Sequence, residues 1–403
     1  MLINNKNHIN PPPVILLGGN IIAVSVARAL GKSGIKCYAL GEATSEVHYS
    51  RFCRGIKYSP NIDKETVYLH WLLNTGRHLH KKPVIIPCSD AGLMLTTNNR
   101  TELEKYFTLM EANDEITLAM LDKAETYALA QKVGIPSPKI WHVDSLEDVH
   151  KILDQVTYPC LLKPRYSHKF FPLFEGRKLF KVGDEGEMLK LFELTQKYDL
   201  QMLITELIPV NSEGYHCYYT HIDENGEPLF HFTKLRPRQY PNLYGLGTYN
   251  VSNWNPEVAD VGLKFLQKIG LRGIGTVEFI RDKRDSVLKL IECNPRFTGT
   301  TELLPICGLN WPLFVYNRMI GAPLPPMNEY KRGVSIIKPA GDFLAFRELN
   351  KAGKLTWIEW LKSLMHPLHF YFFRWNDPLV FLYTIYRFLK HQLKKISKRV
   401  KNS

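Results

Sequence analysis

Two carboxylates occupy matching places in a pair of apolar segments near residue 285. Glu278 lies in "TVEFI", Glu292 lies in "LIECN", and a charged turn centred on Asp285 separates them. Strands joined by such a turn form a hairpin, in which residues equally far from the centre face each other. Side chains along a strand alternate between faces, so Asn294 shares a face with Glu292. The sequence therefore predicts three oxygen-bearing side chains on one side of a hairpin.

Two facing carboxylates repel each other unless a positive charge lies between them. Magnesium prefers oxygen ligands and leaves coordination positions for phosphate oxygens. Glu278, Glu292 and Asn294 are therefore candidate ligands of a divalent cation. The alternative is a pair of edge carboxylates on a solvated face, which the flanking apolar residues disfavour.

Two lysines could supply the positive charge that nucleotide phosphates need. Lys163 ends the apolar strand "YPCLLKP" (158–164), and Lys123 lies early in an amphipathic helix predicted over 118–133. A lysine at the end of a buried strand points to the rim of a sheet, where ligands collect. Taken singly, each lysine also fits a solvated surface position.

The composition indicates a globular protein of two or three domains, because 403 residues with 45% apolar content can bury a sizeable core. Seven cysteines without a CxxC pair suggest free thiols in a reducing, cytoplasmic setting. We expect no secretory signal and no spanning helix, since no run of about 18 apolar residues occurs. His78 and His80 are interpreted as solvated residues and not as metal ligands.

The first 40 residues predict a strand, a glycine turn, a helix and a second strand. "PVILLGGN" carries Gly18 and Gly19 at the turn, and "KPVIIPCSD" (82–90) adds a later strand. Alternation of this kind predicts a parallel α/β sheet. A dinucleotide-binding dehydrogenase would need a GxGxxG pattern, so the single Gly-Gly pair favours a doubly wound domain whose glycines serve the turn.

Four segments together resemble the ATP-grasp superfamily over about residues 12–325. They are "DKAETYALAQKVGIPSPK", "YPCLLKP", "LITELIPVNSEGYH" and the pair "TVEFI" with "LIECNPR". The resemblance implies an α/β (α+β) fold. A Rossmann-like pre-ATP-grasp domain would span 1–115 and an ATP-grasp domain 116–330, with its smaller subdomain at about 137–207. Residues 331–403 would form a C-terminal extension with aromatic and basic helices.

The resemblance also implies a role for each matching residue. The nucleotide would be bound by Lys123 and Lys163 at the phosphates, Glu206 and the Ile208 backbone at adenine, and Glu213 at the ribose. Glu278, Glu292 and Asn294 would hold Mg²⁺, or Mn²⁺ in its place. Arg296, on the same face as Asn294, would steady the transferring phosphoryl group, since phosphoryl transfer depends on electrostatic positioning.

Two further segments narrow the resemblance to the carboxylate–amine ligases that include D-aspartate ligase. "PLFEGRKLFKV" and "KLRPRQYPNLYGLGTYNVS" are similar to that group. Lys234, Arg236 and Arg238 could then hold a substrate carboxylate or the γ-phosphate, and a cationic strand edge is the alternative. The segment that would cover the phosphates has one glycine where many ATP-grasp enzymes are glycine-rich, so Ser167, His168 and Lys178 are candidates there.

The resemblance implies an ATP-dependent carboxylate–amine ligase that forms an amide through an acyl phosphate and releases ADP and phosphate. Its substrates would be a small-molecule carboxylate and amine, such as an amino acid or a cell-envelope precursor. The alternatives are another ATP-grasp enzyme of carboxylase type, and a nucleotide-binding sensor without catalysis. A dehydrogenase would have no need of Glu278, Glu292 and Asn294.

Residues 366–403 carry eight Lys/Arg against one Asp, which accounts for much of the net charge of +13. This concentration gives no reason to expect nucleic acid as a partner. The apolar run "PLVFLYTIYRFL" is too short to span a bilayer. Aromatic and basic residues together suit a helix at an anionic membrane surface, on its inner face. The alternative is a helix packed on the protein with a solvated basic end; the oligomeric state is not predicted.

Overall fold

The computed structural model describes residues 11–401 apart from 43, 57–61, 63, 80, 175–176 and 243–244. At 55–56, 211–212 and 391–401 it describes the backbone alone. The chain divides into two compact units. The first comprises 1–110, 310–325 and 372–403, and the second comprises 111–309 and 326–371.

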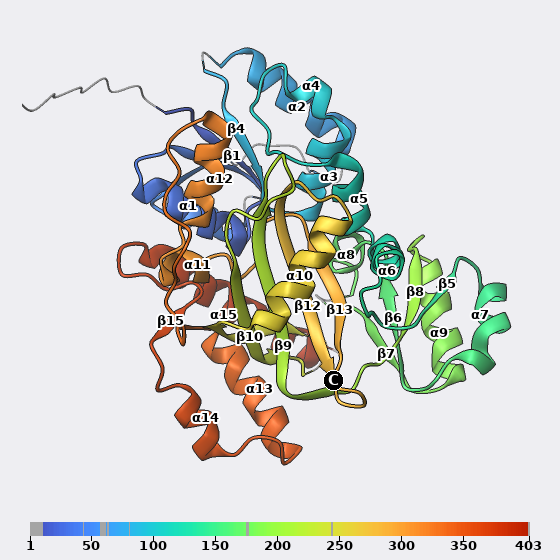
Figure 1. Ribbon diagram of the computed structural model, residues 1–403. Helices are drawn as coiled ribbons and strands as arrows, with labels where there is room; N and C mark the ends of the chain where they lie inside the picture. The colour runs from blue at the N-terminus through green and yellow to red at the C-terminus, as the bar shows by residue number, and fades with distance from the viewer. Residues whose placement is uncertain are drawn as a thin grey trace, which may run out of the picture. The chain divides into compact units, whose positions relative to one another are not determined.

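The first unit contains a parallel four-stranded sheet in the order β3-β2-β1-β4, of which Figure 1 labels β1 and β4. Its strands are β1 (Val14–Leu17), β2 (Cys37–Leu40), β3 (Cys53–Ile56) and β4 (Val84–Pro87). Its helices are α1 (Ile21–Lys32), η1 (Glu46–Tyr49), α2 (Glu65–Arg77), α3 (Asp90–Asn98), α4 (Arg100–Leu103), α12 (Trp311–Ile320) and α15 (Pro378–Lys401). The predicted parallel α/β arrangement is confirmed.

Local sequence explains the turn between β1 and α1. Every residue of β1 is buried, as expected of a strand in a parallel sheet. Gly18 has φ +124°, a conformation that favours glycine, and a Cβ on Gly19 would lie 2.2 Å from the Ser45 side chain. Asn20 then caps α1 by accepting a hydrogen bond from the Ile22 backbone N–H.

A buried ion pair attaches the C-terminal segment to the first unit. The Asp377 carboxylate accepts hydrogen bonds from Arg28 Nε at 2.8 Å, Ser50 Oγ at 2.8 Å and the Arg51 backbone N–H at 2.9 Å. The Arg28 guanidinium also donates to the Phe372 carbonyl at 2.7 Å. Both charged side chains are at most 2% exposed, so the beginning of α15 is held by charges that water does not screen.

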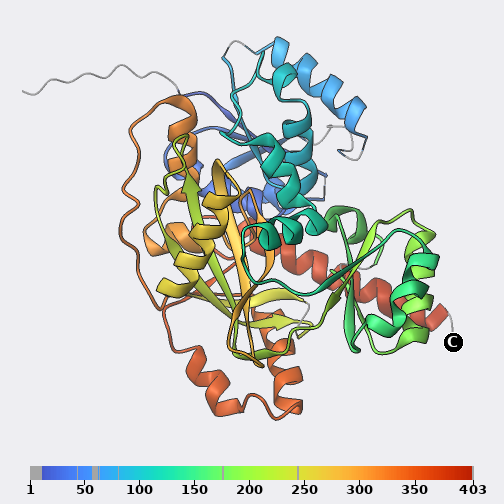
Figure 2. The same cartoon turned by 45° about the vertical axis from the view of Figure 1, so that its right-hand side comes forward.

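The second unit contains a seven-stranded sheet in the order β13-β12-β9-β10-β11-β14-β15, antiparallel except for the last pair. Its strands are β9 (Val210–Ile222), β10 (Phe232–Tyr240), β11 (Leu246–Asn253), β12 (Gly273–Asp282), β13 (Leu288–Asn294), β14 (Ser335–Ile337) and β15 (Leu368–Phe370). Its helices are α5 (Asp114–Leu121), α6 (Lys123–Lys132), α10 (Pro256–Lys268), α11 (Leu303–Cys307), α13 (Pro339–Lys351) and α14 (Trp357–Ser363). Figure 2 shows α10 lying across one face of this sheet, where α5, α6 and α10 share a core with β9, β12 and β13.

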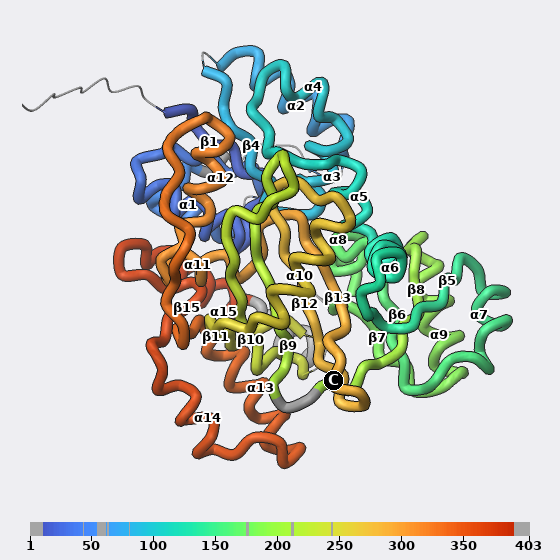
Figure 3. The backbone as a smooth tube through the Cα atoms, viewed as in Figure 1, coloured from blue at the N-terminus to red at the C-terminus, as the bar shows by residue number. Residues whose placement is uncertain are grey.

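A smaller antiparallel sheet in the same unit has the order β5-β8-β6-β7. Its strands are β5 (Ile140–Val143), β6 (Cys160–Pro164), β7 (Phe180–Val182) and β8 (Met202–Glu206). The helices between them are α7 (Leu146–Ile152), η2 (Leu153–Gln155), α8 (Ser167–Phe170) and α9 (Glu185–Gln196). Figure 3 shows α7 and α9 beside this sheet, and their apolar faces form a core of their own with it.

The predicted helix over 118–133 is wrong in one respect, because two helices meet within it. Asp122 has extended backbone angles (φ −91°, ψ 119°), and its carboxylate accepts a hydrogen bond from the Ala124 backbone N–H. An aspartate in this position ends α5 and caps α6, so Lys123 becomes the first residue of a helix. The predicted α/β class with a helical C-terminal segment is confirmed, and the domain boundaries stay a prediction.

We expect Asp377→Ala to lower the free energy of unfolding by about 3–5 kcal/mol, because it leaves the buried Arg28 charge without its partner. Chemical denaturation measures the change. Glu102→Ala, which breaks an exposed pair with Lys105 in the same unit, should cost less than about 1 kcal/mol. Equal stability of the two variants would contradict the role assigned to the buried pair.

Candidate functional site

The β12–β13 hairpin places its carboxylates as the spacing predicts. Glu278 pairs with Glu292, and Thr276 pairs with Asn294. Beyond Glu278 the register shifts, because Phe279 pairs with Leu290. Ile291 is therefore an extra residue in β13, which is how a β-bulge re-aims neighbouring side chains.

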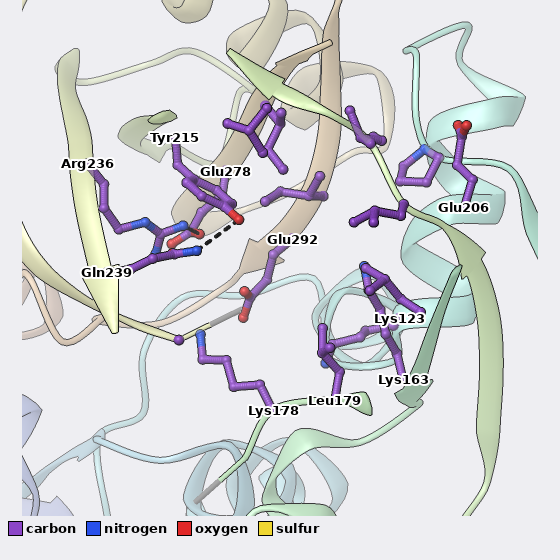
Figure 4. A pocket seen from close by; sticks show the side chains of 18 of the residues that line it. Lys123, Lys163, Lys178, Leu179, Glu206, Tyr215, Arg236, Gln239, Glu278 and Glu292 are labelled. Atoms are coloured by element: carbon purple, nitrogen blue, oxygen red, sulfur yellow. Dashed lines mark hydrogen bonds and ion pairs between the residues drawn. The ribbon is translucent and has the colours of Figure 1, made fainter. Parts of the chain in front are cut away.

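A pocket of about 790 Å³, which includes open solvent at its mouth, lies between this hairpin and the smaller sheet, within the second unit (Figure 4). The predicted residues that line it are Lys123, Lys163, Ser167, Lys178, Glu206, Ile208, Arg236, Glu278 and Glu292. Residues that the sequence did not single out, and that also line it, include Leu179, Leu207, Tyr215, Gln239 and Ile291.

The two phosphate-binding candidates come from different elements that meet at this pocket. Lys123 begins α6, and its backbone N–H donates to the Arg165 carbonyl just after β6 at 3.2 Å. Asp122 strengthens the same junction by pairing with Arg165 Nη2 at 2.6 Å. Lys163 lies in β6, and the Lys123 ammonium donates to Ser167 Oγ at 2.6 Å. The structure therefore brings the two predicted lysines to one place.

Tyr127 connects the smaller sheet to the hairpin and was missed in the sequence. Its hydroxyl accepts a hydrogen bond from Lys163 Nζ at 3.1 Å and donates one to the Ile291 carbonyl at 2.8 Å. A fully buried tyrosine needs a partner for its hydroxyl. Its position in α6, four residues after Lys123, is the one signal that could have pointed to it.

Burial and charge shift the pKa values of two residues in the pocket. Burial, together with the positive charge of Lys123, lowers the pKa of Lys163 to about 8. Burial alone would raise the pKa of Glu292, but the positive charges of Lys178 and Lys123, with those of Arg236 and Arg296, lower it to about 2. Glu292 is therefore ionised at neutral pH, in a site surrounded by cations.

The two carboxylates differ in their partners. Glu278 accepts a hydrogen bond from Arg236 Nη2 at 2.6 Å, and the Arg236 guanidinium lies 4.3 Å from the centre of the Tyr215 ring. Gln239 donates to the Tyr215 hydroxyl at 2.9 Å. Within the described part of the chain Glu292 receives no hydrogen bond, and Figure 4 shows Lys178 extending toward it. An ionised carboxylate with open acceptor sites can bind a cation.

These residues fit a magnesium ion that shares its coordination sphere with phosphate oxygens. Carboxylate oxygens from Glu278 and Glu292 are hard ligands, which suit Mg²⁺. The described residues contain no group of three or more His, Cys, Asp or Glu that could hold a metal by itself. Asn294 lies opposite Thr276 next to this pair, but it does not line the pocket.

The predicted adenine segment follows β8 and reaches the same pocket. Glu206, Leu207 and Ile208 all line it. The Glu206 carboxylate accepts hydrogen bonds from the Lys139 backbone N–H at 3.0 Å and from Arg284 Nη2 at 2.9 Å. Its predicted contact with an adenine amino group would have to share those acceptors.

Besides Asn294, five predicted residues do not line the pocket, namely His168, Glu213, Lys234, Arg238 and Arg296. The Glu213 side chain is 53% exposed and lies beside His216. Arg296 donates to the Phe297 carbonyl, and its charge still reaches Glu292. Lys234 is buried, and its ammonium donates to Asn250 Oδ1 at 2.8 Å. Their individual roles stay predictions.

Side chains from residues 326–371, the last part of the second unit, contact β10 and β11. Asn250, the partner of Lys234, donates to the Tyr371 hydroxyl at 2.8 Å. Arg238 forms a buried pair with Asp342 of α13, with Nε to Oδ1 at 2.7 Å, and also donates to Ser363 Oγ. These contacts join positions more than 100 residues apart, so the sequence pattern could not show them.

Comparison with known proteins identifies relatives that are similar to this chain in sequence. The chain is 24% identical over 326 residues to D-aspartate ligase of Enterococcus faecium, covering 75% of each chain. It is 24% identical over 257 residues to formate-dependent phosphoribosylglycinamide formyltransferase of Ignicoccus hospitalis, covering 60% of each. D-alanine–D-alanine ligase of Thermoanaerobacter pseudethanolicus matches at 24% identity over 44% of this chain and 52% of its own. No family model matches.

Solved structures show the same fold. The biotin carboxylase domain of Hydrogenobacter thermophilus 2-oxoglutarate carboxylase, solved with MgADP, superposes with a TM-score of 0.60 at 20% identity, covering 80% of this chain and 73% of that one. N5-carboxyaminoimidazole synthetase from Staphylococcus aureus, solved with ADP, gives 0.61 at 15% identity, covering 85% and 86%. The chain therefore has the ATP-grasp fold of these structures and is similar in sequence to carboxylate–amine ligases.

Proposed function

We propose that this chain is an ATP-dependent ligase that activates a carboxylate as an acyl phosphate and joins it to an amine. The observation that carries the proposal is the ionised Glu292 carboxylate, which faces Glu278 in a pocket surrounded by lysine and arginine side chains. This distribution of charge suits a magnesium-bound polyphosphate, because it offers both acceptors for the metal and donors for the phosphates.

The basic and acidic residues of the pocket have different roles in this proposal. Lys123 and Lys163 hold the phosphates of ATP, while Glu278 and Glu292, with Asn294 beside them, hold Mg²⁺. The metal neutralises charge that develops on the phosphate oxygens. Lys178 lies next to Glu292, where it can follow the γ-phosphate during transfer.

The reaction then needs two displacements. An oxygen of the substrate carboxylate attacks the γ-phosphorus, the bond to the β-phosphate oxygen breaks, and ADP leaves. The amine nitrogen attacks the acyl carbon, phosphate leaves, and the nitrogen loses a proton as the amide forms. Arg236, held between Glu278 and Tyr215, lies where a positive charge can stabilise the transferring group.

The similarity to D-aspartate ligase and to D-alanine–D-alanine ligase favours an amino acid or a cell-envelope precursor as substrate. A second candidate is an ATP-grasp enzyme whose nucleophile is not a free amine, and the likeness to phosphoribosylglycinamide formyltransferase and biotin carboxylase favours it. A sensor that binds MgATP without turnover is the third. We also propose that the protein is cytoplasmic and lies at the inner face of a membrane.

Phosphate release tests the ligase proposal. Purified protein with MgATP is assayed against L- and D-amino acids, singly and in pairs, and Glu292→Gln runs beside it. We expect release that requires a particular substrate and that falls at least about 100-fold in the variant, because a neutral amide cannot replace the charged metal ligand. Mass spectrometry of the product distinguishes an amine nucleophile from the alternatives.

Glu193→Gln, an identical change at an exposed position of α9, is the matched control and should keep wild-type release. Binding of MgATP without release under any pairing would contradict catalysis on these substrates. Absence of magnesium-dependent ATP binding would overturn the assignment of the hairpin itself.

The pKa of Lys163 predicts that ATP binds less tightly at alkaline pH. Phosphates favour the charged ammonium, so the affinity is highest below the pKa of about 8 in the free protein and falls as the pH rises through it. We expect the dissociation constant for ATP to increase roughly 20-fold between pH 7.5 and pH 9.5, since one proton must be taken up with the ligand. Calorimetry across this range measures it.

Lys163→Arg separates this lysine from other titrating groups. The guanidinium stays charged across the range, so the variant should bind ATP with little dependence on pH. Lys181→Arg, at an exposed position of β7 in the same sheet, should keep the wild-type dependence. An unchanged pH profile in Lys163→Arg would show that another group is responsible.

A further inference from the structure

Helix α15 carries an apolar stripe that faces solvent. Leu379, Leu382, Tyr386 and Leu389 are 56%, 55%, 55% and 54% exposed. Their spacing of three and four residues places them on one side of the helix. Large apolar side chains that are exposed together in this way indicate an interaction surface.

Another face of α15 packs against the rest of the first unit. Val380 is fully buried, and the Tyr383 ring stacks on Tyr49 with 3.7 Å between ring centres. Arg387 pairs with Glu46 at 2.6 Å. The Asp377 pair described above anchors the chain just before the helix. The helix therefore cannot turn its apolar stripe inward without losing these contacts.

The charge of the helix identifies the partner. The backbone is helical as far as Lys401, and the sequence of α15 contains no Asp or Glu. Its basic residues are Arg387, Lys390, Lys394, Lys395, Lys398, Arg399 and Lys401. Leu393, Ile396 and Val400 continue the apolar spacing in the sequence. An apolar stripe on a helix with seven basic and no acidic residues is typical of helices at anionic membrane surfaces.

We propose that α15 binds the surface of an anionic lipid bilayer, with its apolar stripe at the boundary between headgroups and acyl chains. The helix would lie in the plane of the surface, since no helix among the described residues is long and apolar enough to cross a membrane. Trp375, two residues before Asp377, is 90% exposed. Tryptophan is favoured at membrane interfaces. This proposal does not depend on the activity of the ATP site.

A second copy of the chain is the competing occupant, because spacing of three and four residues also suits paired helices. Paired copies of α15 would bring together two strongly basic helices without one acidic residue to form interhelical ion pairs. Anionic headgroups would neutralise the same charge. The balance of charge therefore favours the bilayer.

Vesicle sedimentation of the full chain tests the proposal. Vesicles of phosphatidylcholine with about one quarter phosphatidylglycerol are compared with phosphatidylcholine alone, at low and high salt. We expect binding that needs the anionic lipid and that falls at least about tenfold in the double variant Leu382→Glu with Leu389→Glu. Both positions are exposed and glutamate is a good helix former, so the fold should persist.

The matched control is Ile358→Glu with Leu361→Glu on α14, where the residues are 66% and 54% exposed and the change in charge is the same. It should bind vesicles like the wild type. MgATP binding and sedimentation velocity, measured on all variants, show whether each keeps its fold and its oligomeric state.

Absence of binding to anionic vesicles would overturn the proposal, and so would equal loss in both double variants. A dimer in solution that dissociates in the α15 variant, without binding to vesicles, would assign the stripe to a second copy. If the wild-type chain binds anionic vesicles but turns over no ATP with any substrate, the ligase proposal is contradicted and the membrane proposal stands.

Discussion

The charge balance around Glu292 is the constraint on which the second unit depends. Burial alone would raise the pKa of this carboxylate, and the positive charges near it lower the pKa to about 2. Those charges come from separate elements, namely the beginning of α6 at Lys123, the segment before β7 at Lys178 and strand β10 at Arg236. Without the carboxylates the cations would repel one another, and without the cations the carboxylates would be buried unpaired. The buried carboxylates and the surrounding cations therefore stabilise each other in the pocket.

This balance requires exact alignment of the elements that carry it. A slip of one residue in the β12–β13 pairing would turn Glu292 to the other face of the sheet. The bulge at Ile291 and the Tyr127 hydroxyl, which binds both the Ile291 carbonyl and Lys163, connect the hairpin to the smaller sheet. Helix α6 therefore positions Lys123, Lys163 and the β12–β13 hairpin at the same time.

The parts of the site that were predictable rest on local pattern. Strand alternation and the centre of the charged turn were enough to place Glu278 opposite Glu292, and an apolar strand ending in lysine marked Lys163. Asp122 shows the limit of such patterns, because apolar spacing continues through a residue whose capping geometry divides the helix. Contacts such as Arg236 with Glu278, or Asn250 with Tyr371, depend on which strands lie side by side. The spacing of residues along the chain does not show which strands will be neighbours.

The C-terminal helix α15 is compatible with both of the alternatives that the composition left open. The sequence allowed either a helix packed on the protein or a helix at a membrane surface, and α15 has a face for each. Val380 and Tyr383 pack against the first unit, while Leu382 and Leu389 face outward. A helix that is already folded and anchored through Asp377 loses little conformational freedom when it binds a surface. Packing on the protein thus lowers the entropic cost of the second contact, so the two interpretations support each other.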